Sequence, residues 1–391
     1  MTSTPLTVLD LVPISSGSTP AQALRNSLDL ACQAEQAGYA RYWFAEHHLN
    51  PGVAGTSPAV MIALTAAATS TIRLGSGAVQ MGHRTALATV EEFGLVDALH
   101  PGRLDLGLGR SGGRPPAAAG AGPGAQSDGA RARRDSGQAA AQGARRGRTT
   151  AGGLLIPPPA SLQRLLASPR LALHKRLLQL PGAQPQNYTE QIDDVLALLS
   201  GTFATPDGVE AHIIPGEGAG VQVWILGSSG GESAEVAGAR GLRFAANYHV
   251  SPSNVLEAVD AYRAAFRPSA ELAGPCVSVS ADVVVADDEA TARELASGYG
   301  LWVRSIRTGE GAIPYPTPAQ ARSHTWTDDD RALVSDRTDT QFTGTARQVA
   351  DKLEQLRDAT GADELIVTTI THRHADRVRS YQLLAQEWER R

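Results

Sequence analysis

The run Val221-Gln-Val-Trp-Ile-Leu226 is followed by Gly227-Ser-Ser-Gly-Gly-Glu-Ser233 and then by residues 234–240. These three stretches predict a strand, a loop and a helix, in that order. The β-branched and aromatic side chains of the first run favour a buried strand. Glycine and serine predominate in the second run and end that strand. The apolar period of residues 233–240 indicates a helix that starts at once. A unit of this kind places a parallel strand beside a covering helix.

The same unit recurs along the chain. Short runs rich in β-branched residues alternate with segments of helical period. The predicted strands are residues 6–12, 42–44, 72–79, 103–108, 221–226, 242–246, 277–285 and 365–370. Eight units in strict alternation fit a closed barrel better than a doubly wound sheet. We therefore predict an α/β fold of the (β/α)8 TIM-barrel class, in a single domain of residues 1–391.

One segment, residues 111–153, departs from this pattern. It contains no Val, Ile, Leu, Met, Phe, Trp, Tyr or Cys, and its seven Arg and two Asp give it a charge of +5. Without apolar side chains to bury, it is predicted to be a disordered insert after the fourth strand. A basic run of this kind could also bind an acidic partner or nucleic acid. A third interpretation is a misread GC-rich gene, since the chain has 33 Arg and two Lys.

Composition excludes several classes of protein. The chain of 391 residues is 42% apolar and 19% charged, which rules out overall disorder and fibrous repeats. Two cysteines cannot form a disulfide framework or a four-cysteine zinc site. We expect a cytoplasmic protein, because the sequence has no secretory signal and no apolar run long enough for a membrane. The net charge of −5 argues against nucleic acid as a partner.

Polar and glycine-rich residues follow the predicted strands. In a barrel the carboxyl ends of the strands meet at one face, where functional residues lie. Those residues are Glu46-His47-His48, residues 75–80, residues 107–111, residues 227–233, Asn247-Tyr248-His249 and residues 371–374.

The loop 227–233 has the composition of a phosphate site. Its glycines allow close backbone approach, Ser228, Ser229 and Ser233 supply hydroxyls, and the free amides of a helix N-terminus point into it. An ordinary Gly/Ser turn with a serine cap is the alternative. Arg110, after the fourth strand, could pair with a phosphate or could be a surface cation.

The histidines of the strand ends do not suggest a metal. His47 and His48 are adjacent and therefore point to different sides. His372 and His374 are explained as polar loop residues. No metal site is predicted.

Four motifs together resemble a known family. Residues 43–48, 74–79, 106–110 and 227–234 stand in the order found in bacterial luciferase-like flavin-dependent monooxygenases. The resemblance extends over nearly the whole chain except residues 111–153. It is closest to an actinobacterial subgroup that includes tailoring oxygenases of antibiotic pathways.

This resemblance implies a barrel that takes reduced FMN from a separate NAD(P)H:flavin reductase. By motif correspondence Ser229, Gly230 and Ser233 would hold the FMN phosphate together with Ser228, and Arg110 would assist. Gly77 and Ala78 would lie against the isoalloxazine, at a spot that in this family often carries a bulge or a non-proline cis peptide. His47 would lie near the reactive face of the flavin as the catalytic residue.

The resemblance also implies the chemistry. O₂ adds at the flavin C4a carbon, and the resulting hydroperoxide transfers one oxygen atom to a small organic substrate. The pocket must be dry, and Trp43, Phe44, Met81, Tyr248 and Trp302 are candidate apolar walls. A homodimer is expected from the family, without a legible interface.

Three other functions remain open from the sequence. Related barrels use the deazaflavin F420 for hydride transfer, with no oxygen consumption. The abnormal segment after Arg110 would also be consistent with a non-catalytic flavin-binding protein. The third alternative is a binding protein that uses its Arg-rich stretch for an acidic partner.

Overall fold

Eight parallel strands form the centre of the computed structural model, which describes residues 4–110, 147–184 and 186–391. The strands are β1 (Leu6–Asp10), β2 (Arg41–Phe44), β3 (Arg73–Ser76), β5 (Leu104–Gly109), β8 (Gln222–Gly227), β9 (Arg243–Asn247), β10 (Val277–Ala286) and β12 (Glu364–Thr368). The strands pair in the order β10-β12-β1-β2-β3-β5-β8-β9, and β9 pairs in turn with β10, so the sheet closes on itself. The predicted barrel is confirmed, and each predicted strand is present.

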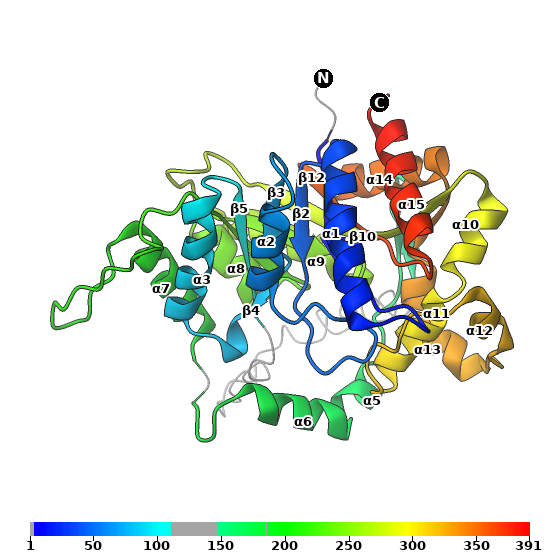
Figure 1. Cartoon of the computed structure of the whole chain (residues 1–391), viewed down its shortest axis with the longest axis horizontal. Coiled ribbons are helices and arrows are strands. Elements are labelled where there is room, and N and C mark those ends of the chain that lie inside the picture. The colour runs from blue at the N-terminus through cyan, green and yellow to red at the C-terminus, as the bar shows by residue number, and fades with distance from the viewer. Residues whose placement is uncertain (1–3, 111–146, 185) are drawn as a thin grey trace, which may run out of the picture.

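Helices surround the barrel (Figure 1). They are α1 (Pro20–Gln36), α2 (Pro58–Ala66), α3 (Ala86–Leu99), α7 (Tyr188–Ser200), α8 (Glu232–Ala239), α9 (Val255–Ala265), α10 (Glu289–Ala296), α14 (Ala346–Thr360) and α15 (His374–Trp388). Local signals fix their ends: Thr345 forms a capping box with Gln348, and Gly361 ends α14 in the left-handed conformation. None of the described helices is both long and apolar enough to cross a membrane.

The third predicted strand is interrupted. It divides into β3 and β4 (Val79–Gln80), and the peptide bond between Gly77 and Ala78 is cis. Where the ladder to β5 breaks, the Ser76 hydroxyl donates to the Gly107 carbonyl (2.8 Å) and accepts from the Gly107 amide (2.9 Å). A side chain at Gly107 would collide with the Ser76 carbonyl oxygen, so only glycine allows this approach.

The segment between β10 and β12 contains more helices and strands than the sequence predicts. The helical period of residues 290–306 predicts one helix, but the structure has two, α10 and α11 (Tyr299–Arg307). Gly298, between them, lies close to Tyr315 and Pro316, where a side chain would not fit without a shift. Three further elements were not predicted: α12 (Pro318–Ser323), α13 (Asp328–Thr338) and β11 (Phe342–Thr345). Acidic residues predominate in the first turn of α13, which conceals its apolar period.

Residues 111–146 of the expected insert lie outside the described residues. Its last part is described: Arg148–Thr149 (β6) pairs antiparallel with Leu155–Ile156 (β7). Here the expectation of disorder is wrong, because the Thr150 hydroxyl and carbonyl close the hairpin. Two short helices follow, α5 (Gln163–Leu166) and α6 (Pro169–Leu178), and α6 lies at the bottom of Figure 1, apart from the helices that flank the strands.

Tryptophans fill the interior of the barrel. Trp43 and Trp224 pack edge to face with their ring centroids 5.1 Å apart, and both are fully buried. Gly75 on the neighbouring strand leaves room for the Trp43 ring, since a side chain there would lie 2.7 Å from it. Side chains that alternate with these point outward and pack against the helices, as Tyr42 and Phe44 do.

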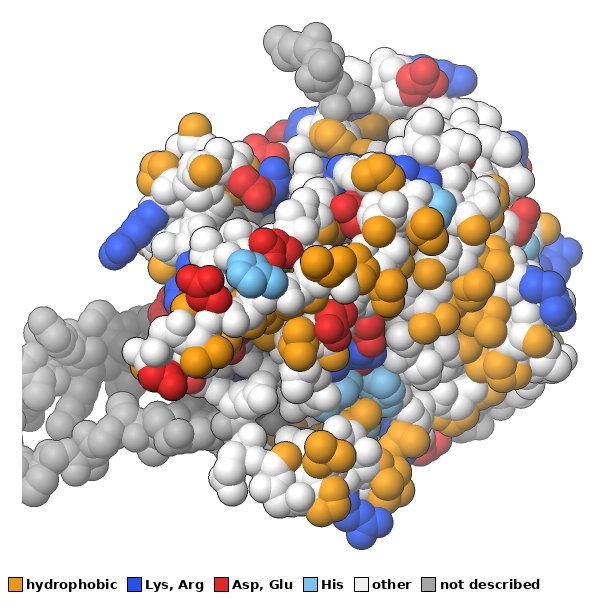
Figure 2. All heavy atoms as spheres, turned by 60° about the vertical axis from the view of Figure 1, so that its left-hand side comes forward, with side chains coloured by type: hydrophobic (Ala, Val, Ile, Leu, Met, Phe, Trp, Pro, Cys, Tyr) orange, Lys and Arg blue, Asp and Glu red, His pale blue; other side chains and the backbone are white. Residues whose placement is uncertain are grey.

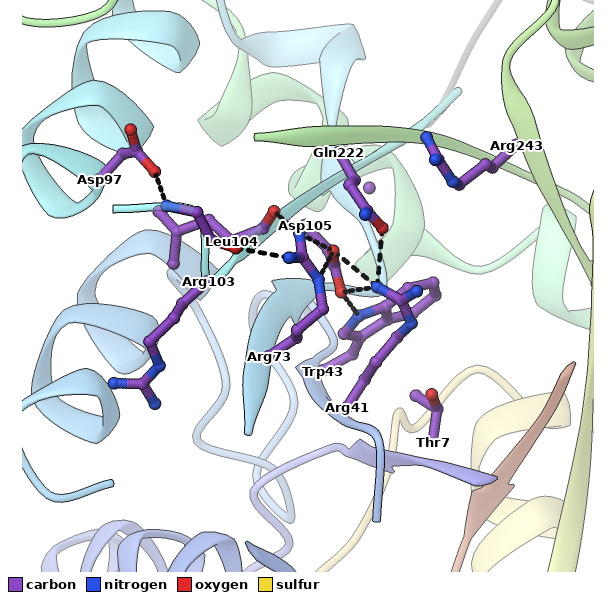
Figure 3. Close-up of polar contacts among 12 residues, drawn as sticks. Thr7, Arg41, Trp43, Arg73, Asp97, Arg103, Leu104, Asp105, Gln222 and Arg243 are labelled. Atoms are coloured by element: carbon purple, nitrogen blue, oxygen red, sulfur yellow. Dashed lines mark hydrogen bonds and ion pairs between the residues drawn. The ribbon is translucent and has the colours of Figure 1, made fainter. Parts of the chain in front are cut away.

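An ion network closes the amino-terminal end of the barrel (Figure 3). Asp105 is fully buried and accepts hydrogen bonds from Arg41 (2.8 Å), Arg73 (2.9 Å) and the Trp43 indole (2.9 Å). Arg41 also contacts Glu364 at 3.1 Å. Charges from four strands therefore meet at one end of the barrel, which leaves the other end for a site.

Candidate functional site

A cavity of about 510 Å³ opens at the carboxyl ends of the strands. Most of the sequence-predicted site residues line it, and they come from four different strand ends. These are His47, Gly77, Ala78, Arg110, Ser228, Ser229 and Ser233. The barrel thus brings together residues that are up to 186 positions apart in the sequence.

Gly230 is the exception among the predicted residues. It is not part of the cavity lining. A side chain at Gly230 would lie 3.0 Å from Glu257 and 3.2 Å from Ala261 on α9. Its role is therefore to let the loop pack against α9, while the serines on either side of it face the cavity.

One end of the cavity has the features of an anion site. α8 begins at Glu232 directly after the glycine loop, and Ser233 lies in its first turn. Arg110 Nη1 donates to Glu232 Oε2 at 2.9 Å, and both side chains are about two-fifths exposed. Arg110 is therefore held beside the helix N-terminus, where free amides and the helix dipole favour an anion.

Tyr188, at the start of α7, is a residue of this end that the sequence did not reveal. Its hydroxyl is buried and has no hydrogen-bond partner among the described residues. Burial raises its pKa, whereas the Ser233 hydroxyl, a hydrogen-bonding neighbour, lowers it. A buried hydroxyl normally finds a partner, and Ser233 is the polar group nearest at hand for Tyr188.

Glu46 lines the cavity beside His47 and binds several polar groups. Its carboxylate accepts from His48 Nε2 at 2.8 Å, His83 Nε2 at 2.9 Å and the Gln80 amide at 2.9 Å. Burial alone would raise the pKa of Glu46, but these hydrogen bonds lower it to about 2. Glu46, His48 and His83 have the spacing of metal ligands. The guanidinium of Arg84, 3.3 Å from the same carboxylate oxygen, disfavours a cation there.

Two histidines of the cavity are held neutral. Burial and the neighbouring His48 lower the pKa of His47 to about 4, and its Nδ1 has no hydrogen-bond partner among the described residues. Burial and Arg337 lower the pKa of His249 to about 3. His249 Nδ1 shares a hydrogen bond with the Ser280 hydroxyl (2.5 Å), which also lies 3.3 Å from the Ala246 carbonyl oxygen.

These pKa shifts predict acid sensitivity of the fold. Between about pH 6.5 and 4 the unfolded chain binds protons at both histidines and the folded chain does not, so stability falls as the pH drops. Each histidine contributes at most about 1.4 kcal/mol per pH unit. Urea unfolding at pH 7.5, 6 and 5 measures this slope. A double variant His47→Gln/His249→Gln should show a flatter profile, and an unchanged slope would contradict the assignment.

The apolar wall of the cavity is formed largely by residues other than the predicted ones. Of the five aromatic and methionine side chains predicted as apolar walls, only Trp302 lines the cavity. Trp43 lies below the cavity beside Asp105, while Phe44, Met81 and Tyr248 belong to the core between strands and helices. Ile306 and Arg337, from α11 and α13, complete this wall together with Leu165 and His174 from α5 and α6.

Comparison with known proteins gives consistent matches along the chain. The family model "Luciferase-like monooxygenase" matches residues 4–151 and 187–364. The uncharacterized protein YvbT of Bacillus subtilis (strain 168) is 33% identical over 387 residues, which are 99% of this chain and 97% of that protein. A luciferase-like monooxygenase of Escherichia coli (strain K12) is 30% identical over 96% of this chain and 94% of its own.

Solved structures with a similar fold superpose on nearly the whole chain. The crystal structure of apo-MsnO8 superposes with a TM-score of 0.74 at 27% identity, over 99% of this chain and 98% of that one. Two distant neighbours share the fold alone: an FMN complex of the oxygenating constituent of 3,6-diketocamphane monooxygenase from Pseudomonas putida (TM-score 0.61, 16% identity) and an F420-dependent secondary alcohol dehydrogenase (0.58, 12%). Each pair covers at least 97% of both chains.

Proposed function

The chain belongs to the luciferase-like monooxygenase family, and from this we propose that it is a flavin-dependent monooxygenase that uses reduced FMN and O₂ to oxygenate a small organic substrate. The observation that carries this proposal is the anion end of the cavity. There the loop that leads into the N-terminus of α8 places Ser228, Ser229 and Ser233 in the same cavity as Arg110. A monophosphate at the tail of a flavin fits these donors.

The residues present fit FMN along the cavity. Ser228, Ser229 and Ser233 would hold the phosphate, and the Gly77–Ala78 segment would lie against the ring system. Reduced FMN, when bound, supplies the two electrons that activate O₂. Arg110 can pair with the phosphate if it leaves Glu232, because the pair is exposed enough to rearrange.

His47 is proposed as the residue that acts on the reacting groups. Its pKa of about 4 keeps it neutral at pH 7, so it can accept a proton or share a hydrogen bond. Its buried Nδ1 has no hydrogen-bond partner among the described residues. Trp302, Ile306 and Leu165 would exclude water from the substrate.

Replacing Tyr188 with phenylalanine should weaken FMN binding by about 3- to 10-fold, because Ser233 in the phosphate loop would lose its hydrogen-bonding neighbour. The free energy of unfolding should fall by at most about 1 kcal/mol, the usual contribution of one hydrogen bond. FMN fluorescence titration measures the affinity. Tyr262→Phe is the matched control, since that buried hydroxyl bonds Leu242 and Cys276 away from the cavity: it should reduce stability and leave FMN affinity intact. Equal FMN affinity in Tyr188→Phe and wild type would remove Tyr188 from the site.

The activity itself is tested by incubating the protein with FMN, NADH, a flavin reductase and O₂. Oxygen consumption and a product with one added oxygen atom are expected when a substrate is present. The same barrel could instead use F420 for hydride transfer, as one structural neighbour does. Turnover with reduced F420 but not with reduced FMN would favour that alternative. FMN binding without reductase-dependent product would favour a non-catalytic flavin-binding protein.

This chemistry implies a partner: a separate NAD(P)H:flavin reductase would supply the reduced flavin.

We also propose a homodimer, in which a second copy of the chain covers α2 and α3. These helices leave five large apolar side chains exposed, and Figure 2 shows hydrophobic side chains gathered on the face that this view brings forward. They are Val60, Leu64, Leu87, Leu95 and Leu99. Such a patch on a protein surface marks an interaction site.

A double variant Leu64→Glu/Leu95→Glu should convert a dimer into a monomer, because two buried charges would oppose association. Light scattering coupled to gel filtration measures the mass. Val209→Glu, at an exposed position on a different part of the chain, should leave the dimer unchanged. A monomeric wild-type protein would contradict the proposed dimer.

A further inference from the structure

We propose that the substrate carries a carboxylate and that Arg337 binds it. This inference rests on the proposed monooxygenase function and concerns the wall of the cavity opposite the phosphate end. It names the class of substrate as an organic acid with an apolar body. The inference follows from the free donors of Arg337, from its burial and from the side chains beside it.

The guanidinium of Arg337 is fixed on one edge only. Nε and Nη2 donate to the Tyr299 hydroxyl at 3.0 and 2.7 Å, and Nη2 lies 3.3 Å from Asp282. Nη1 has no hydrogen bond among the described residues. Arginine carries five N–H donors in one plane, so its two Nη1 protons remain for a ligand. Arg337 is only 9% exposed and lines the cavity.

A neighbouring arginine shows what complete pairing looks like in this region. Arg307 is also buried, and its Nη1 and Nη2 donate to the two carboxylate oxygens of Asp336 at 2.6 and 2.7 Å. Arg307 does not line the cavity. Arg307 is explained by structure alone, whereas Arg337 keeps donors at the cavity.

The two other arginines that line the cavity, Arg110 and Arg170, donate their hydrogen bonds to groups of the protein. Arg110 pairs with Glu232 at the phosphate end. Arg170, on α6, donates to the backbone of Leu49 and to Asn50, and so ties α6 to the loop after β2. Arg337 alone of these three is buried, so a ligand there would be shielded from water and its charge-assisted hydrogen bond would be strong.

The surroundings of Arg337 favour a planar monoanion with an apolar body. Asp282 is close enough to repel a dianion such as a phosphate, while a carboxylate can accept from Nη1 in the guanidinium plane. Trp302 and Ile306 supply apolar surface on the same wall. The neutral ring of His249 adds a polar group on the cavity lining that can bond an N–H or O–H of the substrate.

Binding of two isosteric probes, octanoate and octanamide, tests the proposal on the FMN-loaded protein. Isothermal titration should show octanoate binding about 10- to 100-fold more tightly, the range for a hydrogen bond to a charged group. Arg337→Gln should abolish this preference, Arg337→Lys should retain part of it, and FMN affinity should be unchanged in both. Arg307→Gln is the matched control and should retain the preference at a measurable cost in stability.

Equal binding of the two probes to the wild-type protein would overturn the proposal, even if Arg337→Gln failed to fold. A preference that persists in Arg337→Gln would also overturn it. Loss of FMN binding in that variant, with octanoate still preferred, would assign Arg337 to the cofactor instead. Failure of the proposed function would be recognised separately, as absent FMN binding or absent reductase-dependent oxygen consumption in the wild-type protein.

Discussion

Replacing Asp105 with alanine is expected to lower the free energy of unfolding by about 3–5 kcal/mol, the usual cost of removing one partner of a buried ion pair. The substitution would leave Arg41, Arg73 and the Trp43 indole without their shared acceptor (Figure 3). Arg41 would keep only Glu364 and Gln222. Two guanidinium groups would then face each other at the closed end of the barrel.

Chemical denaturation of both proteins measures this loss. Asp193→Ala is the matched control, because its ion pair with Arg240 has similar distances but lies at the surface, with Asp193 about half exposed. Exposed pairs contribute at most about 1 kcal/mol. Asp105→Asn keeps one acceptor and should fall between the two. A loss below 1 kcal/mol for Asp105→Ala would show that the network does not hold the barrel together.

His47→Ala is expected to lower turnover by at least about 100-fold, within the range for a general acid–base group, while FMN affinity changes little. His47 lies at the end of β2 and lines the cavity, and its backbone amide is fixed by the Gly55 carbonyl at 2.7 Å. The backbone therefore holds the ring in place without using its nitrogens. His47→Gln should recover part of the rate if hydrogen bonding is what matters.

Turnover and FMN affinity must be measured on the same preparations, with reduced FMN, O₂ and the substrate that the coupled assay identifies. His372→Ala is the control: His372 follows the last strand of the barrel but binds the Ser16 carbonyl and does not line the cavity. It should turn over at the wild-type rate. If His47→Ala kept that rate as well, the residue would have a structural role only.

Much of the fold follows from the sequence because each βα unit carries its own signal. β-Branched runs and helical periods are local patterns, and their alternation predicts the parallel barrel. The proposed phosphate loop is local too, since Gly227–Ser233 and the start of α8 are contiguous. Local patterns do not show how the third strand is interrupted, because the Ser76 contacts that bridge it involve Gly107, 31 residues away.

The residues missed in the site are those whose role depends on distant neighbours. Tyr188 has an ordinary helix-start context, and only the fold places its hydroxyl beside Ser233. Arg337 belongs to a polar helix, and its cavity position follows from contacts with Tyr299 and Asp282. Trp43 was predicted as a wall of the cavity, but it lies below the cavity beside Asp105. The strand alternation predicts that its side chain points into the barrel, but not at which depth the ring lies.

The two walls of the cavity are formed by different segments of the chain. The cofactor side is formed by the ends of consecutive strands, whereas Trp302, Ile306 and Arg337 come from the excursion between β10 and β11, and Leu165 and His174 from the one between β5 and β8. The proposed flavin side and the proposed substrate side of the cavity therefore lie on separate segments of the chain, and the second can change without the first. Chimeras that graft the β10–β11 excursion of a relative onto this barrel should acquire that relative's substrate range.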